Sequence, residues 1–401
     1  MNMNKHYIFF TRHTVPQPNA AYLVHDVNSA NAAANLGYST VLVYLHPPEK
    51  SLNPLDWVYP FRLQHPPENL TKFYSIQDQL KVAPLAMPWP IGQIQGKLTS
   101  PSTIVCRYYF PIHIFPHTQI LHTLDWNLVK TAIKHGVPVI YEREHYEKSD
   151  YDQSIVQNPL FQVAVTVADN IRDDMIRRGM PPEKIIKLHS GFNQSFLVRQ
   201  PEQASEWRKK LLLDNRQKLV VYSGGLYRFK GVNLLVDVAK ELPQIQFVFA
   251  GGNESQVESY QQLAREKQAD NVTFLGYLTH QQLTSLLQAA DVLAHPHCSG
   301  EAASFTSPLK LFEYMASGTP IVATEIPPLM EFKSSNAIAG WCEPDNPAQF
   351  TRCLQQVLET YPRNVNGYAA QIKWGRQFCW ENRIVKILSN VAESIHPILC
   401  D

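Results

Sequence analysis

The stretch that decides the fold is SFTSPLKLFEYMASGTPIVAT, residues 304–324. Small hydroxyl residues precede a helix that carries Glu313, the helix breaks at Gly318, and a buried-strand pattern runs to Thr324. The first N–H groups of a helix lack intrahelical partners, and the positive end of the helix dipole lies beside them. The loop therefore predicts an anion site, and Glu313, about two turns further in, can accept hydrogen bonds from ribose hydroxyls. A nucleoside diphosphate satisfies both halves.

The alternative interpretation of this stretch is an ordinary helix-to-strand unit of an α/β domain, with Glu313 on a solvated face.

The segment PLKLFEYMASGTPIVAT, residues 308–324, resembles the donor site of the family-4 glycosyltransferases. Four other segments match the same family in the same order. The resemblance is good over roughly residues 120–396 and weak over the first hundred. It implies the GT-B fold, an α/β architecture of two Rossmann-like domains facing a central cleft.

Composition sets limits on the class of protein. At 401 residues the chain has room for two α/β domains of about 150–200 residues each. A net charge of +1 with mixed signs gives no basis for nucleic-acid binding. No apolar run reaches the roughly 18–20 residues of a membrane span, and the N-terminus lacks a signal peptide's apolar core. We expect a cytoplasmic protein, with peripheral membrane association left open.

The cysteines and paired carboxylates do not predict a metal site. Six cysteines are scattered without a CxxC pair, which indicates reduced thiols rather than a disulfide framework or a zinc site. Asp150 and Asp152 have the D-x-D spacing of metal-dependent glycosyltransferases of the other major fold. Nothing else in the chain fits that fold. We therefore predict no metal.

The pattern along the chain predicts three parts. Residues 1–195 form an N-terminal Rossmann-like domain that binds the acceptor, with a Pro- and aromatic-rich insertion at about 47–101. After this insertion, the next strand is expected at the apolar stretch Thr103–Arg107. Residues 196–375 form the C-terminal Rossmann-like domain that binds the nucleotide-sugar donor, and residues 376–401 form a helix that, by the resemblance, crosses back to the first domain.

A glycine-rich loop supplies the basic groups of the predicted donor site. The segment GGLYRFKG, residues 224–231, follows a strand and precedes a helix, which is phosphate-binding geometry. The family's usual pattern places an arginine and a lysine on the diphosphate. Lys230 matches the lysine, whereas Gly225 stands at the arginine position, and we infer that Arg228 supplies the missing charge. The alternative is a turn whose Lys and Arg face solvent.

The chain departs from the family pattern a second time, at a pair of glutamates. The family usually carries two glutamates eight positions apart, the first of which touches the donor sugar. Counting back from Glu313 reaches Phe305, which is not acidic. Glu301, four residues earlier, is the candidate replacement, and an exposed loop carboxylate is the equal alternative.

Candidate acceptor residues follow a strand of the first domain. Glu142, Glu144 and His145 stand at its C-terminal end, where α/β sheets present ligand-binding residues. His145 resembles the family's histidine beside the donor sugar, and a neutral imidazole can bond a sugar hydroxyl. His122 is a weaker candidate, with a core role favoured. Asn19 is a candidate contact because the family's N-terminal glycine-rich loop is replaced here by a stretch without glycine.

These assignments predict a glycosyltransferase, and the family resemblance implies that it retains the anomeric configuration. It uses no cofactor and no metal, takes a UDP- or GDP-linked sugar as substrate, and transfers the sugar to a glycan, lipid-linked or small-molecule acceptor. We assign catalysis to Lys230, Arg228, His145 and Glu301, and acceptor contacts to Asn19 and Glu144. The residues assigned to the donor are Gly224, Gly225, Lys230, Thr306, Ser307, Pro308, Leu309, Lys310 and Glu313. The alternatives are another GT-B enzyme, such as a nucleotide-sugar epimerase or a phosphorylase-like protein, and a non-catalytic relative that binds sugar nucleotides or glycans.

Overall fold

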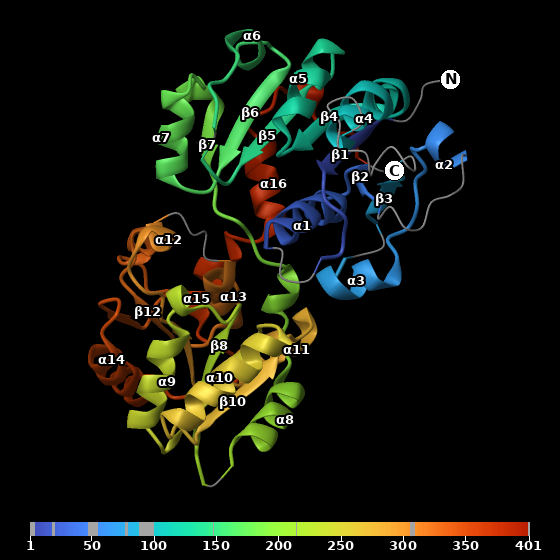
Figure 1. The fold of residues 1–401 in the computed structure, drawn as a ribbon. Helices are drawn as coiled ribbons and strands as arrows, with labels where there is room; N and C mark the ends of the chain where they lie inside the picture. The colour runs from blue at the N-terminus through green and yellow to red at the C-terminus, as the bar shows by residue number, and fades with distance from the viewer. Residues whose placement is uncertain are drawn as a thin grey trace. The chain divides into compact units, whose positions relative to one another are not determined.

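A computed structural model describes residues 5–17, 21–46, 55–76, 79–87, 100–146, 148–213, 215–304 and 309–399. The chain forms two compact α/β units (Figure 1). The first unit comprises Met1–His189 and Trp380–Asp401, and the second comprises Ser190–Cys379. The sequence-based boundaries lay at residues 195/196 and 375/376.

The first unit is built on a seven-stranded parallel sheet of order β3-β2-β1-β4-β5-β6-β7. Its central strands are buried on both faces, as β-branched and aromatic runs such as TVLVYL in β2 require. The strands are β1 (His6–Thr11), β2 (Thr40–Leu45), β3 (Lys81–Leu85), β4 (Thr118–Thr123), β5 (Val139–Arg143), β6 (Phe161–Thr166) and β7 (Ile185–Lys187).

Helices connect these strands. They are α1 (Ala21–Asn35), α2 (Leu55–Val58), α3 (Glu68–Tyr74), α4 (Pro101–Ile104), η3 (Val105–Ile114), η4 (Phe115–His117), α5 (Trp126–Lys134), α6 (Gln153–Val156), α7 (Asp169–Arg177), η5 (Pro182–Lys184), α16 (Trp380–Leu388) and η9 (Glu393–Ile395). The last two come from the C-terminal end of the chain, and α16 packs on α1. The sequence insertion at 47–101 contributes α2, α3 and the edge strand β3.

One secondary-structure prediction is wrong. The stretch Thr103–Arg107 is helical, because Ser100 caps a helix that has Pro101 at its first position. The Ser100 hydroxyl accepts a hydrogen bond from the Thr103 backbone N–H at 3.3 Å. The strand that pairs with β1 is instead β4, which begins at Thr118.

The second unit has a six-stranded parallel sheet of order β10-β9-β8-β11-β12-β13. Alternate residues of β8 enter different cores: Leu219 and Val221 join one hydrophobic cluster, and Val220 and Tyr222 join another. Both faces of this sheet are therefore covered. Its strands are β8 (Lys218–Ser223), β9 (Ile245–Ala250), β10 (Val272–Gly276), β11 (Val292–His295), β12 (Ile321–Thr324) and β13 (Gly340–Cys342).

Two of the covering helices begin with capping boxes, Asn253 with Gln256 on α10 and Thr279 with Gln282 on α11. The helices are η6 (Gln194–Leu197), α8 (Pro201–Leu211), η7 (Arg228–Lys230), α9 (Val232–Glu241), α10 (Glu254–Glu266), α11 (His280–Ala289), α12 (Glu301–Ser304), α13 (Leu309–Ser317), η8 (Pro327–Phe332), α14 (Pro347–Thr360) and α15 (Ala369–Arg376). The prediction of two parallel-sheet, Rossmann-like domains is confirmed.

Candidate active site

The glycine-rich loop leaves the sheet of the second unit at the end of β8. Gly224 has φ 126° and Gly231 has φ 75°, both in the region that favours glycine. A Cβ atom on Gly231 would lie 1.7 Å from the carbonyl oxygen of Pro296. Gly231 is also the residue before the first turn of α9, which has no side-chain cap. The loop thus needs glycine at this point, and it leaves the α9 N-terminus uncapped by a side chain.

Two lysines carry the positive charge beside this loop. Lys310, in the first turn of α13, places its ammonium group 4.2 Å from the ring centroid of Tyr222. A Cβ atom on Gly224 would lie 3.5 Å from that ammonium group. Lys230 lies 5.3 Å from the ring centroid of Tyr227. Within the described part of the chain the buried Lys310 ammonium has no hydrogen-bond partner.

The electrostatics of the two lysines favour an anion. Burial lowers the pKa of Lys310 well below its usual value, and the charge of Lys230 lowers it further. Burial likewise lowers the pKa of Lys230. Each shift means that the charged form is poorly solvated, so a phosphate between these groups would stabilise it. The pair is suited to bind a diphosphate.

Glu313 lies one turn after Lys310 on the same helix. Burial raises the pKa of Glu313 to about 7, although Lys310 opposes the rise. The next residue, Tyr314, fixes the helix to the sheet because its hydroxyl accepts a hydrogen bond from the Ser223 backbone N–H at 2.7 Å. Lys310 and Glu313 are therefore held near the end of β8, as the donor assignment requires.

Two histidines that the sequence analysis overlooked lie beside the lysines. His295 and His297 are fully buried and stack with their ring centroids 4.7 Å apart. Burial, and then the charge of Lys310, lowers the pKa of His297 to about 2. Burial, and then the charge of His297, lowers the pKa of His295 well below its usual value, so both rings are neutral. The available signal was the alternation in AHPH, residues 294–297, at the C-terminal end of a buried parallel strand.

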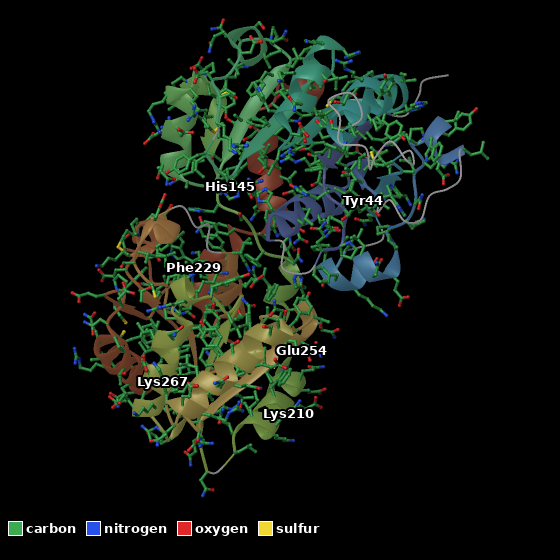
Figure 2. All side chains as sticks on the ribbon, in the orientation of Figure 1. Tyr44, His145, Lys210, Phe229, Glu254 and Lys267 are labelled. Carbon is green, nitrogen blue, oxygen red and sulfur yellow. The ribbon has the colours of Figure 1, made fainter. Side chains whose placement is uncertain are left out.

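One of the two departures from the family pattern, Gly225, has a local structural cause. A Cβ atom on Gly225 would lie 2.6 Å from the ring of Tyr227, so the tyrosine ring fills the space where an arginine side chain would begin. Arg228 is exposed. Burial raises the pKa of Tyr260, and the charge of Arg228 lowers it, so Arg228 lies close enough to act on that tyrosine. Phe229, labelled in Figure 2, stacks on Tyr227 with ring centroids 5.6 Å apart.

The structure describes some of the other predicted site residues but not all of them. Glu301 is exposed at the start of α12, and Leu309 begins α13. Thr306, Ser307 and Pro308 lie outside the described residues, as does Phe305.

In the first unit, Glu142 at the end of β5 is the centre of a buried charge cluster. Its carboxylate is 1 % exposed and receives two hydrogen bonds from Arg383 of α16, at 2.8 and 2.9 Å. His25 Nε2 and His122 Nε2 each lie 2.6 Å from a carboxylate oxygen. Since the carboxylate only accepts, both ring nitrogens donate. His122 therefore accepts from the Tyr7 hydroxyl through Nδ1, at 2.8 Å.

This cluster sets the protonation of His25. Burial lowers the pKa of His25, but the carboxylates of Glu142 and Glu144 outweigh it and raise the pKa to about 10. Burial raises the pKa of the neighbouring Asp26 to about 7, against the opposing charge of His25. Burial raises the pKa of Glu142, but the charges of Arg383 and then His25 outweigh it and hold that pKa well below its usual range. Glu142 thus serves as a structural anchor for α16, and His122 has the core role that the sequence favoured.

A cavity of about 600 Å³ opens above this cluster at the C-terminal ends of β1, β4 and β5. Asp26, Glu144 and His145 are among the residues that line it. Glu144 accepts from His25 Nδ1 at 2.8 Å. Figure 2 shows the exposed His145 just beyond the end of β5. Asn19 lies outside the described residues. The other lining residues are Phe10, Thr11, Arg12, His13, Leu124, Asp125, Trp126, Asn127, Glu142, Arg143 and Lys148.

Among the residues that the structure describes, no group of three or more His, Cys, Asp or Glu side chains is placed to hold a metal ion. The D-x-D pair has structural partners. Asp150 lies 3.7 Å from Arg178, and Asp152 caps α6 by accepting from the Ser154 backbone N–H at 2.9 Å. In the described chain no helix has both the length and the apolar character needed to cross a membrane.

Comparison with known proteins identifies the class. Residues 203–374 match the model of the family described as Glycosyl transferases group 1. The solved structure of Alr3699/HepE from Anabaena, in complex with UDP and glucose, superposes with a TM-score of 0.65 at 15% identity, covering 96% of this chain and 99% of that one. Sucrose-phosphate synthase from Thermosynechococcus elongatus gives a TM-score of 0.66 at 17% identity, covering 96% and 98%. The chain has the GT-B fold of glycosyltransferases.

Two curated relatives are similar in sequence to this chain over part of their length. D-inositol 3-phosphate glycosyltransferase from Corynebacterium aurimucosum is 28% identical over 57% of this chain and 56% of its own. Alpha-galactosylglucosyldiacylglycerol synthase from Streptococcus pneumoniae is 26% identical over 50% and 52%. The chain thus spans little more than half the length of these two relatives. The match of residues 203–374 to the group 1 glycosyltransferase model agrees with the family resemblance of the sequence.

Proposed function

We propose that this protein is a glycosyltransferase that moves a sugar from a nucleoside-diphosphate donor to an acceptor, with retention of configuration and without a metal. The observation that carries the proposal is the pair of desolvated lysines, Lys230 and Lys310, beside the Gly224 loop inside the group 1 domain. The donor is UDP- or GDP-linked. The solved structure with UDP and glucose supports the UDP form first.

The chemistry follows from where charge develops. Breaking the bond from the anomeric carbon to the diphosphate leaves negative charge on the β-phosphate. Fixed positive groups at that position stabilise the transition state more than the ground state. Lys230 and Lys310 supply those charges, and the uncapped start of α9 adds backbone N–H groups. The leaving phosphate then accepts the acceptor's proton on the same face, which gives retention.

Glu313 is proposed to bind the ribose. A carboxyl group that accepts two hydroxyl hydrogen bonds is stabilised in its ionised form, which would reverse the rise of the Glu313 pKa to about 7. The neutral rings of His295 and His297 offer further hydrogen-bonding nitrogens beside the phosphates.

The acceptor is proposed to occupy the 600 Å³ cavity of the first unit. Asp26 and Glu144 can accept hydrogen bonds from acceptor hydroxyls, and His145 can orient the acceptor from the wall. Arg12 and Lys148 line the same cavity and suit an anionic group on the acceptor. An inositol phosphate, as in the name of the corynebacterial relative, has both features. A lipid-linked acceptor, as in the pneumococcal relative's name, is the second candidate.

A thermal-shift panel of UDP, GDP, ADP, CMP and dTDP, with Mg²⁺ or with EDTA, tests the donor assignment. A nucleotide at about 100 times its Kd stabilises a protein by about 2.7 kcal/mol. We expect UDP or GDP to raise the melting temperature equally in both conditions. A shift that requires Mg²⁺ would contradict metal independence, and no shift with any nucleotide would contradict the donor site.

The alternatives predict different products. A nucleotide-sugar epimerase would convert the donor without an acceptor, and a phosphorylase-like protein would require inorganic phosphate. A non-catalytic relative, which Gly225 and Phe305 favour because charges are absent there, would bind nucleotide and consume no donor.

A further inference from the structure

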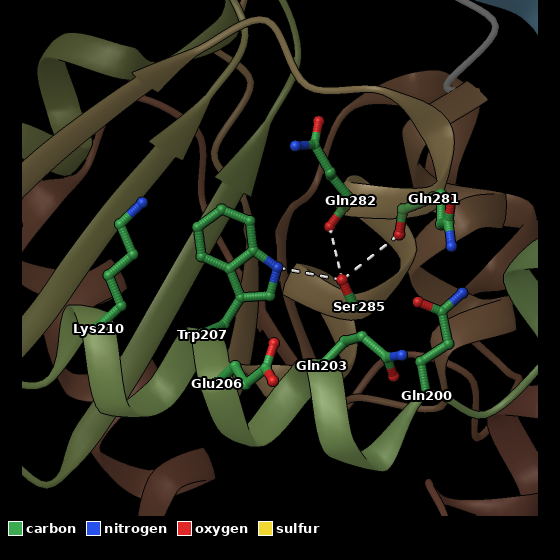
Figure 3. Close-up of a pocket in the computed structure, with 8 residues that line it drawn as sticks. All are labelled: Gln200, Gln203, Glu206, Trp207, Lys210, Gln281, Gln282 and Ser285. Atoms are coloured by element: carbon green, nitrogen blue, oxygen red, sulfur yellow. Dashed lines mark hydrogen bonds between the residues drawn. The ribbon is translucent and has the colours of Figure 1, made fainter. Parts of the chain in front are cut away.

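A second groove lies in the second unit between α8 and α11, apart from the loops that form the donor site (Figure 3). Its volume is about 310 Å³, at the lower end of the roughly 300–1,000 Å³ typical of small-molecule sites. Helix α8 and the residue before it supply five lining residues, and α11 supplies three. They are Gln200, Gln203, Glu206, Trp207, Lys210, Gln281, Gln282 and Ser285.

Trp207 provides a fixed aromatic surface at the centre of the groove. Its indole N–H donates to the Ser285 hydroxyl at 3.1 Å, and that hydroxyl donates to the Gln282 carbonyl at 3.0 Å. These bonds hold the ring in one orientation, which Figure 3 shows with Lys210 on one side and the α11 residues on the other. The Lys210 ammonium lies 5.3 Å from the ring centroid, and the Lys210 side chain is exposed.

Amide groups surround the ring. Gln203 and Gln281 are exposed. The Gln282 side-chain oxygen accepts a hydrogen bond from the Thr279 backbone N–H in the α11 capping box. The Gln200 side-chain oxygen is buried and has no hydrogen-bond partner among the described residues. Each primary amide offers two donors and one acceptor, which matches the dual character of a sugar hydroxyl.

The charge of the lining excludes strongly ionic ligands. Glu206 and Lys210 contribute one charge of each sign, so the groove has no net charge to attract a phosphate or a polyanion. An apolar ligand would leave the amides without partners, which costs free energy. A neutral sugar satisfies both requirements, because its C–H face packs on an aromatic ring while its hydroxyls reach the amides.

We propose that the α8–α11 groove binds a neutral oligosaccharide, with one sugar ring stacked on Trp207. This site is separate from the donor and acceptor sites and does not depend on the proposed transfer reaction.

Isothermal titration of the full chain with maltotetraose, cellotetraose and mannotetraose tests the proposal. We expect at least one of the three to bind, and Trp207→Ala to weaken that binding at least about tenfold, which corresponds to loss of one aromatic contact with its buried area. Trp374→Ala is the matched control, because Trp374 is 36 % exposed on α15 of the same unit, and it should bind as the unchanged protein does.

A second variant guards against misfolding of Trp207→Ala. Gln203→Ala combined with Gln281→Ala removes two exposed amides without touching the Trp207–Ser285 bond, and we expect a measurable loss of affinity with an unchanged melting temperature. The proposal is overturned if none of the three oligosaccharides binds at millimolar concentration. It is also overturned if Trp207→Ala and the double variant bind as tightly as the unchanged protein, since the saccharide would then occupy another site.

Discussion

At the scale of single residues, the lysines of the second unit are the most informative side chains. A buried ammonium group without a hydrogen-bond partner is costly, and a second cation nearby raises that cost. Folded proteins keep such groups where a ligand of opposite charge completes them. The arrangement around Lys310 is therefore better explained by anion binding than by stability.

Replacing either lysine tests this explanation. We expect Lys230→Ala and Lys310→Ala each to lower the rate of sugar transfer by about 10²–10³-fold, the usual cost of removing one donor to developing negative charge. The melting temperature without nucleotide should not fall, because each change removes a desolvated charge. Lys240→Ala, on the exposed side of α9, is the control and should transfer normally. Transfer rates with saturating donor, together with melting curves, distinguish these results from unfolding.

The contact between Gly225 and Tyr227 predicts an interaction between two substitutions. Gly225→Arg alone should lower the melting temperature and weaken nucleotide binding, because its Cβ atom would meet the Tyr227 ring at 2.6 Å. Adding Tyr227→Ala removes the ring and should restore binding. A double-mutant cycle on nucleotide affinity measures the coupling. If the two changes are additive, Tyr227 does not explain the missing arginine.

At the scale of secondary-structure elements, Arg383 ties α16 to the sheet of the first unit through Glu142. Removing one partner of a buried ion pair typically costs about 3–5 kcal/mol, since the other charge is left unpaired. We expect Arg383→Met to destabilise the first unit by that amount. Amide hydrogen exchange, measured peptide by peptide, should show lower protection of α1 and β5. The protection of the second unit should not change. Lys386→Met, an exposed change on the same helix, is the control; equal protection in both variants would contradict an anchoring role.

The same cluster predicts a pH dependence. The pKa of His25 is about 10 in the folded protein, above its ordinary 6.5, so its stabilisation is complete below pH 6.5 and is lost as the pH rises through 10. The free energy of unfolding of the unchanged protein should therefore exceed that of His25→Gln most at pH 6.5 and least near pH 10. Urea unfolding at pH 6.5, 8 and 9.5 gives this difference directly. A difference that does not fall between pH 6.5 and 9.5 would show that His25 is neutral in the fold.

The sequence predicted elements whose signals are contiguous better than contacts between residues far apart in the chain. The α13–β12 unit, with Lys310, Glu313 and Thr324, could be predicted because the residues that define it are contiguous in the sequence. The stretch Thr103–Arg107 was wrongly predicted as a strand, because Ser100 and Pro101 give a helix start to a stretch with strand-like composition. The contact of Arg383 with Glu142, 241 residues apart, had no local signal.

At the scale of the whole molecule, the fold class was predictable and the details of the site only in part. Alternating strand and helix patterns allow little besides two parallel-sheet units. The buried histidines His295 and His297 could not be assigned, because fifteen histidines in the chain give no reason to favour two of them before their surroundings are known. The cavity of the first unit was equally hidden, since it gathers residues from three separated strands.

The central claim, that this protein transfers a sugar, is tested most directly by following donor and product together. Labelled UDP- and GDP-glucose would be incubated with EDTA and an inositol phosphate, a diacylglycerol or a neutral disaccharide, while nucleoside diphosphate and glycoside are measured. We predict that one acceptor triggers release of nucleoside diphosphate in equal amount to a new glycoside, and that Lys310→Ala abolishes most of both. Donor bound but never consumed with any acceptor, or donor converted without one, would contradict the claim.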